Sequence, residues 1–503
     1  MCLGSALALL ACARDRAPPK PVLTQPSVEA LTKLTAASVE QKLPRMPRDL
    51  AWLAFGGGSD PLSNQVSMAQ DLELAASVLS GRGFTMFASG PGAMMAVERG
   101  DLLMDDARED VTLGLARLFG PAEAERVRYQ ASTLSVDAPA ARDHVVEALQ
   151  GALEGGPAPL VVVAASHGDR GATARENELS LWGGWSLGVE DVAELLDHAY
   201  QPRPTRWIVT ACYGGGFAEL VFVGALPQRG LRSPDHCGVF AAPWDDQSSG
   251  CDPNPDRRQQ DAYAIHFFSA LRGEARDGSN RLAEIDLDHD QRVGLLEAHA
   301  WARIHSHSLD VPTTTAERFL REFARSYEGD RSIATGEPEE SAVVSALSSE
   351  LELADEREAR SKLAELDRIL ADVRAQLDEA QRISDDSYYA LRIALLERWP
   401  LIEHAWEPRT RALIERDGAR IQQLLTDSEL ARGYAAAERE LSDATGQHDA
   451  VRVTRARVLR LVRAHETLRL VSVLKRRNGA RYEHYQALRR CERHVPEVHP
   501  RKR

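Results

Sequence analysis

The sequence predicts an α/β protein, with a three-layer αβα sandwich around a mostly parallel sheet, followed by an all-α C-terminal region. Short continuous apolar runs, typical of strands buried on both faces, alternate with amphipathic segments over residues 48–328. Beyond residue 345, apolar residues recur three and four positions apart, as they do in helices. The chain has 503 residues, of which 43% are hydrophobic, so we expect a sizeable core and two or three domains.

The N-terminal segment, residues 1–12, is small and apolar and ends in Leu9-Leu10-Ala11-Cys12. This ending resembles a bacterial lipobox, in which the cysteine is lipidated and becomes the mature N-terminus. No Lys or Arg precedes the apolar region, so a chance apolar start is the alternative. Residues 13–47 hold several prolines and few aromatic residues, as a tether would. We therefore expect an exported lipoprotein of the cell envelope, anchored through Cys12, with a cytoplasmic protein as the alternative.

Charge and hydropathy restrict the partners of the chain. The formal net charge of −14 argues against nucleic acid as a partner of the whole chain. No apolar run after the first twelve residues approaches the length needed to cross a bilayer. Membrane attachment would therefore depend on the N-terminal segment.

Five predicted strands and four predicted helices alternate through residues 48–328. The strands are expected at residues 50–55, 84–88, 160–165, 207–209 and 238–242, with a long insertion between the second strand and about residue 138. The helices are expected at residues 65–79, 142–153, 189–199 and 261–272. Connections between parallel strands are almost always right-handed, and these helices then form a layer on each side of the sheet.

Two of these strands are followed by residues that can take part in catalysis. His167, with Gly168 behind it, follows the strand at residues 160–165, and Cys212 follows the strand at residues 207–209. The carboxyl ends of parallel strands meet at one edge of the sheet, where ligands bind. A thiol needs a base or a positive environment to become a nucleophile, and His167 would supply it. Either residue alone is more often structural, but together they predict a Cys–His dyad.

The blocks Ser166-His167-Gly168 and Thr210-Ala211-Cys212 resemble the His-Gly and Ala-Cys blocks of caspase-like cysteine peptidases. The likeness is closest to bacterial members of the legumain family and covers roughly residues 48–328. Three further stretches agree with it, namely residues 55–66, 179–183 and 238–251. The resemblance implies a caspase-like fold and a cysteine endopeptidase that forms a thioacyl-enzyme on a peptide or protein substrate, without an organic cofactor. It also implies an oxyanion hole made by the backbone N–H groups of Gly168 and Cys212.

Specificity and the competing functions are less well marked in the sequence. Asp245, Asp246 and Gln247 follow the strand after the cysteine strand and are expected to line the substrate pocket.

The alternative to an enzyme is a catalytically idle scaffold that acts as an interaction protein through its helical C-terminal domain. The chain keeps both His167 and Cys212 with their glycines, which favours the enzyme. No G-x-S-x-G elbow supports a different hydrolase.

An acidic loop offers a candidate metal site. Asp286, Asp288, Asp290 and Glu297 occupy positions one, three, five and twelve of an EF-hand pattern, and their oxygen ligands suit Ca²⁺. Gln291 stands where the pattern has a glycine with positive φ. The alternative is a loop that caps the following helix and binds no metal. The nearby histidines lack the i, i+4 spacing of a helical metal pair and are expected on the helix surface; they are His299, His305 and His307.

The remaining cysteines allow more than one arrangement. Cys237 and Cys251 flank one strand and would bridge in an oxidising compartment, but two unpaired buried thiols are the favoured expectation. Cys491 lies far away in the last helix.

The C-terminal part is expected to comprise an acidic linker (329–345), a helical domain (346–494) and a basic tail (495–503). A heptad seam favours a small bundle or an antiparallel coiled-coil hairpin, interrupted by prolines; its residues are Leu363, Leu366, Leu370, Val373 and Leu377. Arginines between residues 452 and 477 are expected to be solvated or to pair with acidic groups. As in the legumain family, we expect this extension to restrain activity until the linker is cut. A role in binding a helical partner or forming a dimer is the alternative.

Overall fold

The computed structural model describes residues 43–47, 49–98, 111–119, 127–324, 336–405, 407–494 and 496–498. Cys12, the N-terminal segment and most of the expected tether lie outside the described residues, as do residues 329–335 of the expected linker and most of the basic tail. Among the described helices, none combines the length and the apolarity that a membrane span needs.

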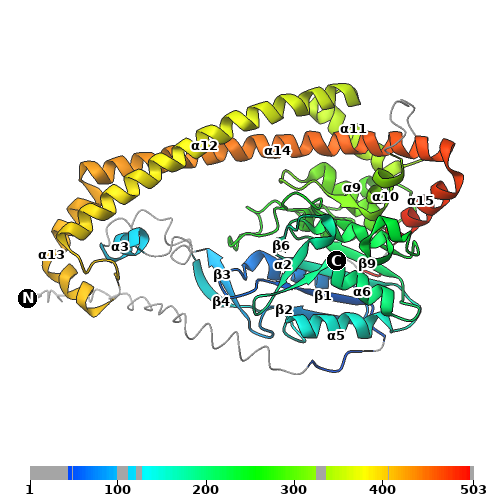
Figure 1. Ribbon diagram of the computed structural model, residues 1–503, viewed down its shortest axis with the longest axis horizontal. Coiled ribbons are helices and arrows are strands. Elements are labelled where there is room, and N and C mark those ends of the chain that lie inside the picture. The colour runs from blue at the N-terminus through cyan, green and yellow to red at the C-terminus, as the bar shows by residue number, and fades with distance from the viewer. Residues whose placement is uncertain are drawn as a thin grey trace, which may run out of the picture.

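A six-stranded, mostly parallel sheet forms the centre of the molecule, as the sequence predicts (Figure 1). Its order is β11-β10-β9-β5-β1-β2, and only the short β11 runs antiparallel to its neighbour. The strands are β1 (Trp52–Gly57), β2 (Gly83–Phe87), β5 (Leu160–Ser166), β9 (Thr205–Val209), β10 (His236–Phe240) and β11 (Thr313–Thr314). The five strands expected from apolar runs are all present, with ends displaced by no more than a few residues.

Helices cover both faces of this sheet because the side chains of each strand alternate between them. On β5, Val161 and Val163 belong to the core under one layer of helices, whereas Val162 and Ala164 belong to the core under the other. The first layer contains α2 (Val66–Val78), α7 (Tyr263–Leu271), α8 (Leu282–Ile285) and α9 (Leu295–His305). The second contains α5 (Arg142–Leu153) and α6 (Val189–His198). The molecule therefore has a three-layer αβα body.

Two smaller sheets and a helix extend this body. The expected insertion contains an antiparallel pair, β3 (Met94–Glu98) and β4 (Val127–Ala131), with α3 (Val111–Phe119) between them in sequence. A three-stranded sheet follows the histidine and consists of β6 (Gly168–Asp169), β7 (Glu178–Leu181) and β8 (Trp185–Gly188). A 3-10 helix, Gly214–Val221, follows the cysteine.

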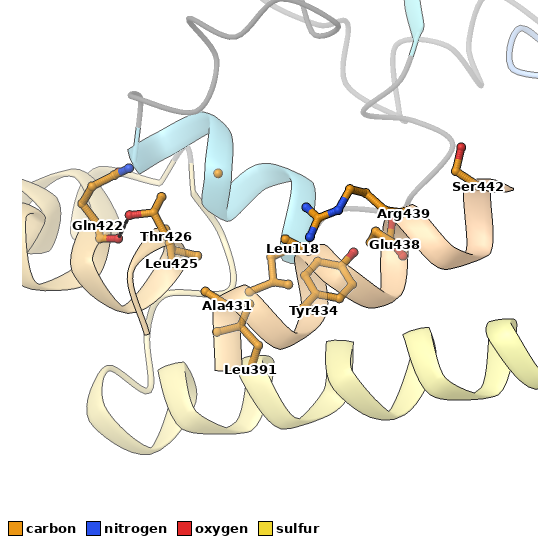
Figure 2. A pocket seen from close by; sticks show the side chains of 12 residues that line it. Leu118, Leu391, Gln422, Leu425, Thr426, Ala431, Tyr434, Glu438, Arg439 and Ser442 are labelled. Atoms are coloured by element: carbon orange, nitrogen blue, oxygen red, sulfur yellow. Dashed lines mark hydrogen bonds between the residues drawn. The ribbon is translucent and has the colours of Figure 1, made fainter. Parts of the chain in front are cut away.

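The C-terminal region is helical, as expected, and consists of a long helix pair with short helices at both ends (Figure 1). Its helices are α11 (Pro338–Leu351), α12 (Glu356–Arg398), α13 (Pro408–Thr426), α14 (Glu429–Arg477) and α15 (Gly479–Glu492). α12 and α14 run side by side in opposite directions, and the expected leucine seam on α12 is partly buried, with Leu366 the most buried member. At the end remote from the sheet, α3 packs its Leu115 and Leu118 against α12 and α13. A pocket of about 550 Å³ opens there between α3, α12, α13 and α14 (Figure 2).

The prediction of a linker at residues 329–345 is wrong for its second half. α11 begins at Pro338, and Glu339 and Glu340 are buried in its first turn. Arg303 of α9 donates to both carboxylate oxygens of Glu340 at 2.9 Å, and Arg489 of α15 donates to Glu339 at 2.9 Å. Sequence reasoning took the run of acidic residues for a solvated segment because their arginine partners lie elsewhere in the chain.

The arginines of α14 bind within the molecule. Arg460 is fully buried and donates to the backbone carbonyls of Arg303, Ser306, Ser308 and Asp310 at 2.6–3.1 Å. Arg455 and Arg457 form ion pairs with Asp367 and Glu350. The expectation that this face pairs with acidic groups is confirmed for these two. The buried Arg460 makes α14 part of the same core as α9.

A disulfide joins Cys237 of β10 to Cys491 of α15, so the expectation of an unpaired Cys237 is wrong. Spacing along the chain gave no sign of this bond, since 254 residues separate the two cysteines. After α15 the chain runs back along the sheet body, where Ser80 N–H donates to the carbonyl of Glu497 at 2.8 Å. A disulfide and a backbone hydrogen bond thus connect the C-terminal region to the αβα body.

Candidate active site

His167 and Cys212 lie at the same edge of the sheet. β5 and β9 are adjacent and parallel, and their register pairs Ala164 with Val209 just before the two strands end. Both side chains are partly exposed. A Cβ atom on Gly168 would lie 1.9 Å from the carbonyl oxygen of Cys212, so only glycine permits this contact between the two loops. The sequence prediction that these two strand ends meet is confirmed.

The imidazole ring of His167 is oriented by the loop after β1. Its Nε2 lies 2.8 Å from the carbonyl oxygen of Ser63. A carbonyl only accepts hydrogen bonds, so Nε2 carries a proton and Nδ1 is the basic nitrogen of the neutral ring. Asp60 shapes this loop, because its Oδ1 accepts from the N–H groups of Leu62 and Ser63 at 2.8 and 3.1 Å. The basic nitrogen is therefore directed into the site.

Nδ1 of His167 faces a third residue, Cys251, whose Sγ lies 3.2 Å away. No hydrogen bond joins the ring to the Cys212 sulfur among the described residues, so the expected direct pairing of the dyad is absent here. Cys251 is an unpaired thiol, as the sequence analysis expected, but it lies inside the site. The segment after β10 leaves the same edge of the sheet as those after β5 and β9, and that topology brings Cys251 to the site.

The sulfur of Cys212 has several hydrogen-bond donors beside it, and the carbonyl oxygen of Ser248 lies 3.6 Å from it. A hydrogen bond from the Cys251 thiol is the main cause that lowers the pKa of Cys212 to about 6, against the opposing effect of burial. The N–H of Ser248, 3.3 Å from the sulfur, and the Ser248 hydroxyl, at 3.8 Å, act in the same direction. Ser248 is itself held by a 2.9 Å bond from its hydroxyl to the carbonyl of Thr210. Cys212 therefore has the character of a thiolate near neutral pH.

Cys251 has the opposite electrostatic environment. Its hydrogen bond to the Cys212 sulfur and its burial raise its pKa well above the usual value. The buried carboxylates Asp71 and Asp310 act in the same direction. In this pair Cys212 is the sulfur that loses its proton and Cys251 the one that keeps it.

Two backbone N–H groups are available to an oxygen bound at this edge. In the register of β6 and β7, Ser180 N–H donates to the carbonyl of His167, which leaves the N–H of Gly168 outside the ladder. The N–H of Cys212 has no acceptor among the residues that the structure describes. These are the two groups expected to form an oxyanion hole.

Asn177 is a structural residue of the site that sequence reasoning missed. It is buried, and its Nδ2 donates to the carbonyls of Tyr213 (3.0 Å) and Trp244 (2.7 Å). Its Oδ1 accepts from the N–H of Gly171 at 3.0 Å. One amide thus joins the loops after β5, β9 and β10 and supports Tyr213, whose φ of 57° is left-handed. An isolated asparagine between loop residues gives no sequence signal for such a role.

The residues expected to line the substrate pocket lie beside the cysteine loop. The carbonyl of Asp246 accepts from the N–H of Tyr213 at 2.9 Å, whereas the side chains of Asp245 and Gln247 are exposed. Oε1 of Gln247 lies 3.5 Å from Nη2 of Arg452, so α14 passes close to this loop. The three residues therefore lie beside the loop that carries the nucleophile.

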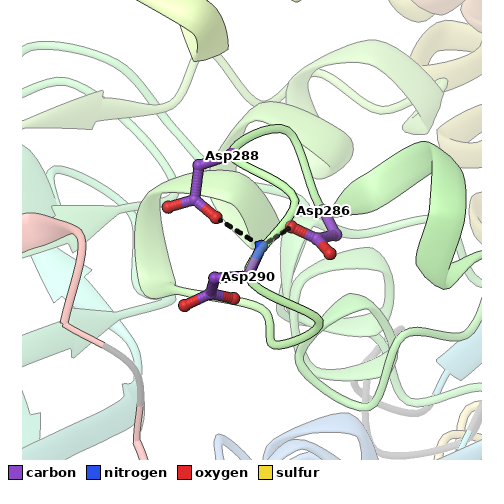
Figure 3. Close-up of side chains that lie close together, drawn as sticks. All are labelled: Asp286, Asp288 and Asp290. Atoms are coloured by element: carbon purple, nitrogen blue, oxygen red, sulfur yellow. Dashed lines mark hydrogen bonds between the residues drawn. The ribbon is translucent and has the colours of Figure 1, made fainter.

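The acidic loop brings three of its four expected ligands together. Carboxylate oxygens of Asp286, Asp288 and Asp290 lie within 4.8 Å of one another, a donor set that fits a hard cation (Figure 3). Gln291 has a φ of 68°, so it adopts the conformation that the pattern normally assigns to glycine. Glu297 does not join the cluster, because both of its carboxylate oxygens accept backbone N–H groups from Leu287, Asp288 and Gly294. Its observed role is to cap α9 and close the loop.

One of the histidines near this loop contradicts the sequence prediction. His299 is fully buried on α9, and its Nδ1 lies 2.9 Å from the hydroxyl of Tyr263. Burial is the main cause that lowers its pKa to about 3. His305 is exposed on α9, as expected, whereas the exposed His307 lies just beyond the end of that helix. The buried His299 packs within the core and contributes nothing to the candidate metal site.

A comparison with models of known protein families finds no match, and no curated protein is similar enough in sequence to count as a relative.

Proposed function

We propose that this chain is a cysteine endopeptidase of the caspase-like, legumain-like type, with Cys212 as the nucleophile and His167 as the acid–base group. The observation that carries the proposal is the meeting of these two residues at the ends of adjacent parallel strands. The lowered pKa of Cys212 supports it, because a thiolate is the reactive form of cysteine. The order of strands in the sheet agrees with the same type of fold.

In this mechanism the Cys212 sulfur attacks the carbonyl carbon of a peptide bond. The developing oxyanion accepts from the N–H groups of Gly168 and Cys212, and such donors are each worth about 3 kcal/mol in the transition state. Nδ1 of His167 first accepts the proton of the Cys212 thiol, and the resulting imidazolium gives that proton to the leaving amine, which leaves a thioacyl-enzyme. His167 then removes a proton from the water that hydrolyses the intermediate.

Cys251 has a defined part in this mechanism. It donates a hydrogen bond to the Cys212 sulfur, which stabilises the thiolate before attack. Its sulfur also lies next to Nδ1 of His167. The Cys251 side chain must therefore move away from Nδ1, or relay the proton, when His167 protonates the leaving amine. A substrate backbone would run along the edge formed by the loops after β5, β9 and β10, with Asp245, Asp246 and Gln247 beside it.

Two accessory features accompany the proposed enzyme. The Cys237–Cys491 disulfide supports export to an oxidising compartment, in agreement with lipidation at Cys12. Asp286, Asp288 and Asp290 would hold a calcium ion, which would neutralise their charges and stabilise the loop that precedes α9.

Cleavage of unstructured peptides by the reduced, purified full chain tests the proposed function, with products identified by mass spectrometry. We expect Cys212→Ala to abolish cleavage and His167→Ala to reduce it about a hundredfold or more. His305→Ala is the matched control, because His305 is an exposed histidine of α9, and it should cleave like the wild type. Undiminished cleavage by Cys212→Ala overturns the proposal, and a folded wild type without any cleavage favours the idle scaffold.

A further inference from the structure

Two free thiols meet at the candidate active site although they come from different loops. Cys237 and Cys491 are already bridged, which leaves Cys212 and Cys251 as the free cysteines of the described chain. Cys212 follows β9, and Cys251 lies midway along the segment between β10 and α7. Cys251 Sγ lies 3.2 Å from Nδ1 of His167, and the N–H of Ser248, three residues before Cys251, donates to the Cys212 sulfur at 3.3 Å.

The loop that carries Cys251 is fixed on both sides of the thiol. Before it, the N–H of Ser249 donates to Oδ1 of Asp310 at 2.6 Å, and Ser248 is bonded to Thr210. After it, the N–H of Asp252 donates to the hydroxyl of Ser67 at 2.8 Å. The fold therefore holds the Cys251 thiol beside His167, on the loop whose Ser248 contacts the Cys212 sulfur.

The two thiols differ in the way that a peroxide-reactive pair requires. Both thiols are partly exposed, but the pKa of Cys212 is lowered, so Cys212 is the sulfur that reacts first with an oxidant. Cys251 keeps its proton, and its sulfur lies 3.2 Å from Nδ1 of His167. A base next to the second thiol can remove its proton at the moment when it is needed as a nucleophile.

We propose that Cys212 and Cys251 form a reversible disulfide that masks the nucleophile, with Cys251 as the resolving thiol and a hydroperoxide as the oxidant. The disulfide stands independently of the proposed peptidase activity, whereas its effect on catalysis rests on that activity.

The chemistry proceeds in two balanced steps. The Cys212 thiolate attacks one oxygen of hydrogen peroxide and the O–O bond breaks, leaving a sulfenic acid at Cys212. The departing hydroxide becomes water by taking the proton that His167 had accepted from the Cys212 thiol, so His167 is again neutral. His167 then accepts the proton of Cys251, and the Cys251 sulfur attacks the sulfenic sulfur. The S–O bond breaks and the hydroxide leaves as water with the proton from His167. The sum is two thiols and one peroxide converted to one disulfide and two waters.

The disulfide would remove the nucleophile and prevent further oxidation. A sulfenic acid without a neighbouring thiol proceeds to sulfinic acid, which ordinary thiol reductants do not reverse. A disulfide at this position is reduced by a dithiol, which restores both Cys212 and Cys251.

Peptide mapping of the wild-type full chain under non-reducing conditions tests the proposal directly. The digest must cut between Cys237 and Cys251, and Asp245 or Asp246 offers such a site. After a few equivalents of hydrogen peroxide we expect the peptide containing Cys212 to be linked to the peptide containing Cys251, and dithiothreitol to release it. Sulfinic acid at Cys212 with a free thiol at Cys251 overturns the proposal.

Two variants sharpen the result. In Cys251→Ser, peroxide should convert Cys212 irreversibly to the sulfinic or sulfonic acid, whereas a variant with both Cys237→Ser and Cys491→Ser should still link Cys212 to Cys251. Reversible oxidation of Cys212 in Cys251→Ser contradicts the resolving role. If a variant does not fold, the wild-type map alone decides. Because the map needs no substrate, the linkage succeeds or fails independently of peptidase activity.

Discussion

Sγ of Cys251 lies 3.2 Å from Nδ1 of His167, the histidine that the sequence pairs with Cys212. The histidine and the nucleophile are thus joined through a third side chain. Cys251 is the main cause of the lowered pKa of Cys212, and the N–H and hydroxyl of Ser248 act in the same direction.

The first prediction concerns this hydrogen bond. Cys251→Ala should raise the pKa of Cys212 from about 6 toward the usual value of about 8.5, because the thiolate loses its main donor. Cys251→Ser keeps a hydroxyl donor and should cause a smaller change. The rate of alkylation of Cys212 by iodoacetamide, followed against pH by mass spectrometry, measures the midpoint. An unchanged midpoint in Cys251→Ala would show that Cys251 does not tune the nucleophile.

The second prediction concerns Asn177. Asn177→Ala should lower the free energy of unfolding by about 1–3 kcal/mol, because the carbonyls of Tyr213 and Trp244 and the N–H of Gly171 lose a buried partner. Urea unfolding measures this change. Gln447→Ala, at an exposed position of α14, is the control and should stay within about 0.5 kcal/mol of the wild type. A loss for Asn177→Ala no larger than that of the control would contradict its structural role.

The third prediction concerns Arg460. Arg460→Met should destabilise the protein by more than about 3 kcal/mol, because four buried carbonyls lose their donor. Arg455→Met on the same helix removes only a partly exposed ion pair with Asp367 and should cost less than about 1 kcal/mol. Calorimetry compares the two. Equal stabilities would mean that α14 does not share the core of the αβα body.

The fourth prediction concerns calcium. Asp286, Asp288 and Asp290 repel one another when no cation is bound, so a cation should stabilise the folded state by mass action. For a dissociation constant of about 1 mM, 10 mM calcium would add about 1.4 kcal/mol. Asp288→Asn should remove most of this gain, whereas Asp372→Asn on the exposed face of α12 should retain it. If 10 mM calcium does not change the melting temperature, the loop binds no calcium and serves only to cap α9.

Most of the αβα body could be predicted because its strands and helices have distinct local patterns of apolar residues. A strand buried on both faces must be apolar along its length, and its periodicity differs from that of the flanking helices. The runs at β1, β5, β9 and β10 are of this kind, and the rule that parallel strands share a carboxyl edge placed His167 beside Cys212. The same rule applied to β10 points toward Cys251, and that signal was available in the sequence.

Contacts between distant segments explain what the sequence did not reveal. The Cys237–Cys491 bond, the Arg303–Glu340 pair and the buried Arg460 each join residues that no local pattern connects. These contacts also bear on the expectation that the helical extension restrains activity until the linker is cut, because they make the extension part of the folded core. A chain ending near Tyr327 would lose the helices that complete two of the hydrophobic cores, so its behaviour would report folding as well as inhibition.

Covalent labelling of the reduced full chain with a peptide-based electrophile, read by intact mass and peptide mapping, tests the central claim most directly. We predict one adduct per chain, located on Cys212, that is lost in Cys212→Ala and forms much more slowly in His167→Ala. Cys251 serves as an internal control, since it is a free cysteine at the same site. An adduct on Cys251 in the wild type, or labelling of Cys212 that is indifferent to His167→Ala, would contradict the assignment of Cys212 as nucleophile and His167 as its acid–base partner.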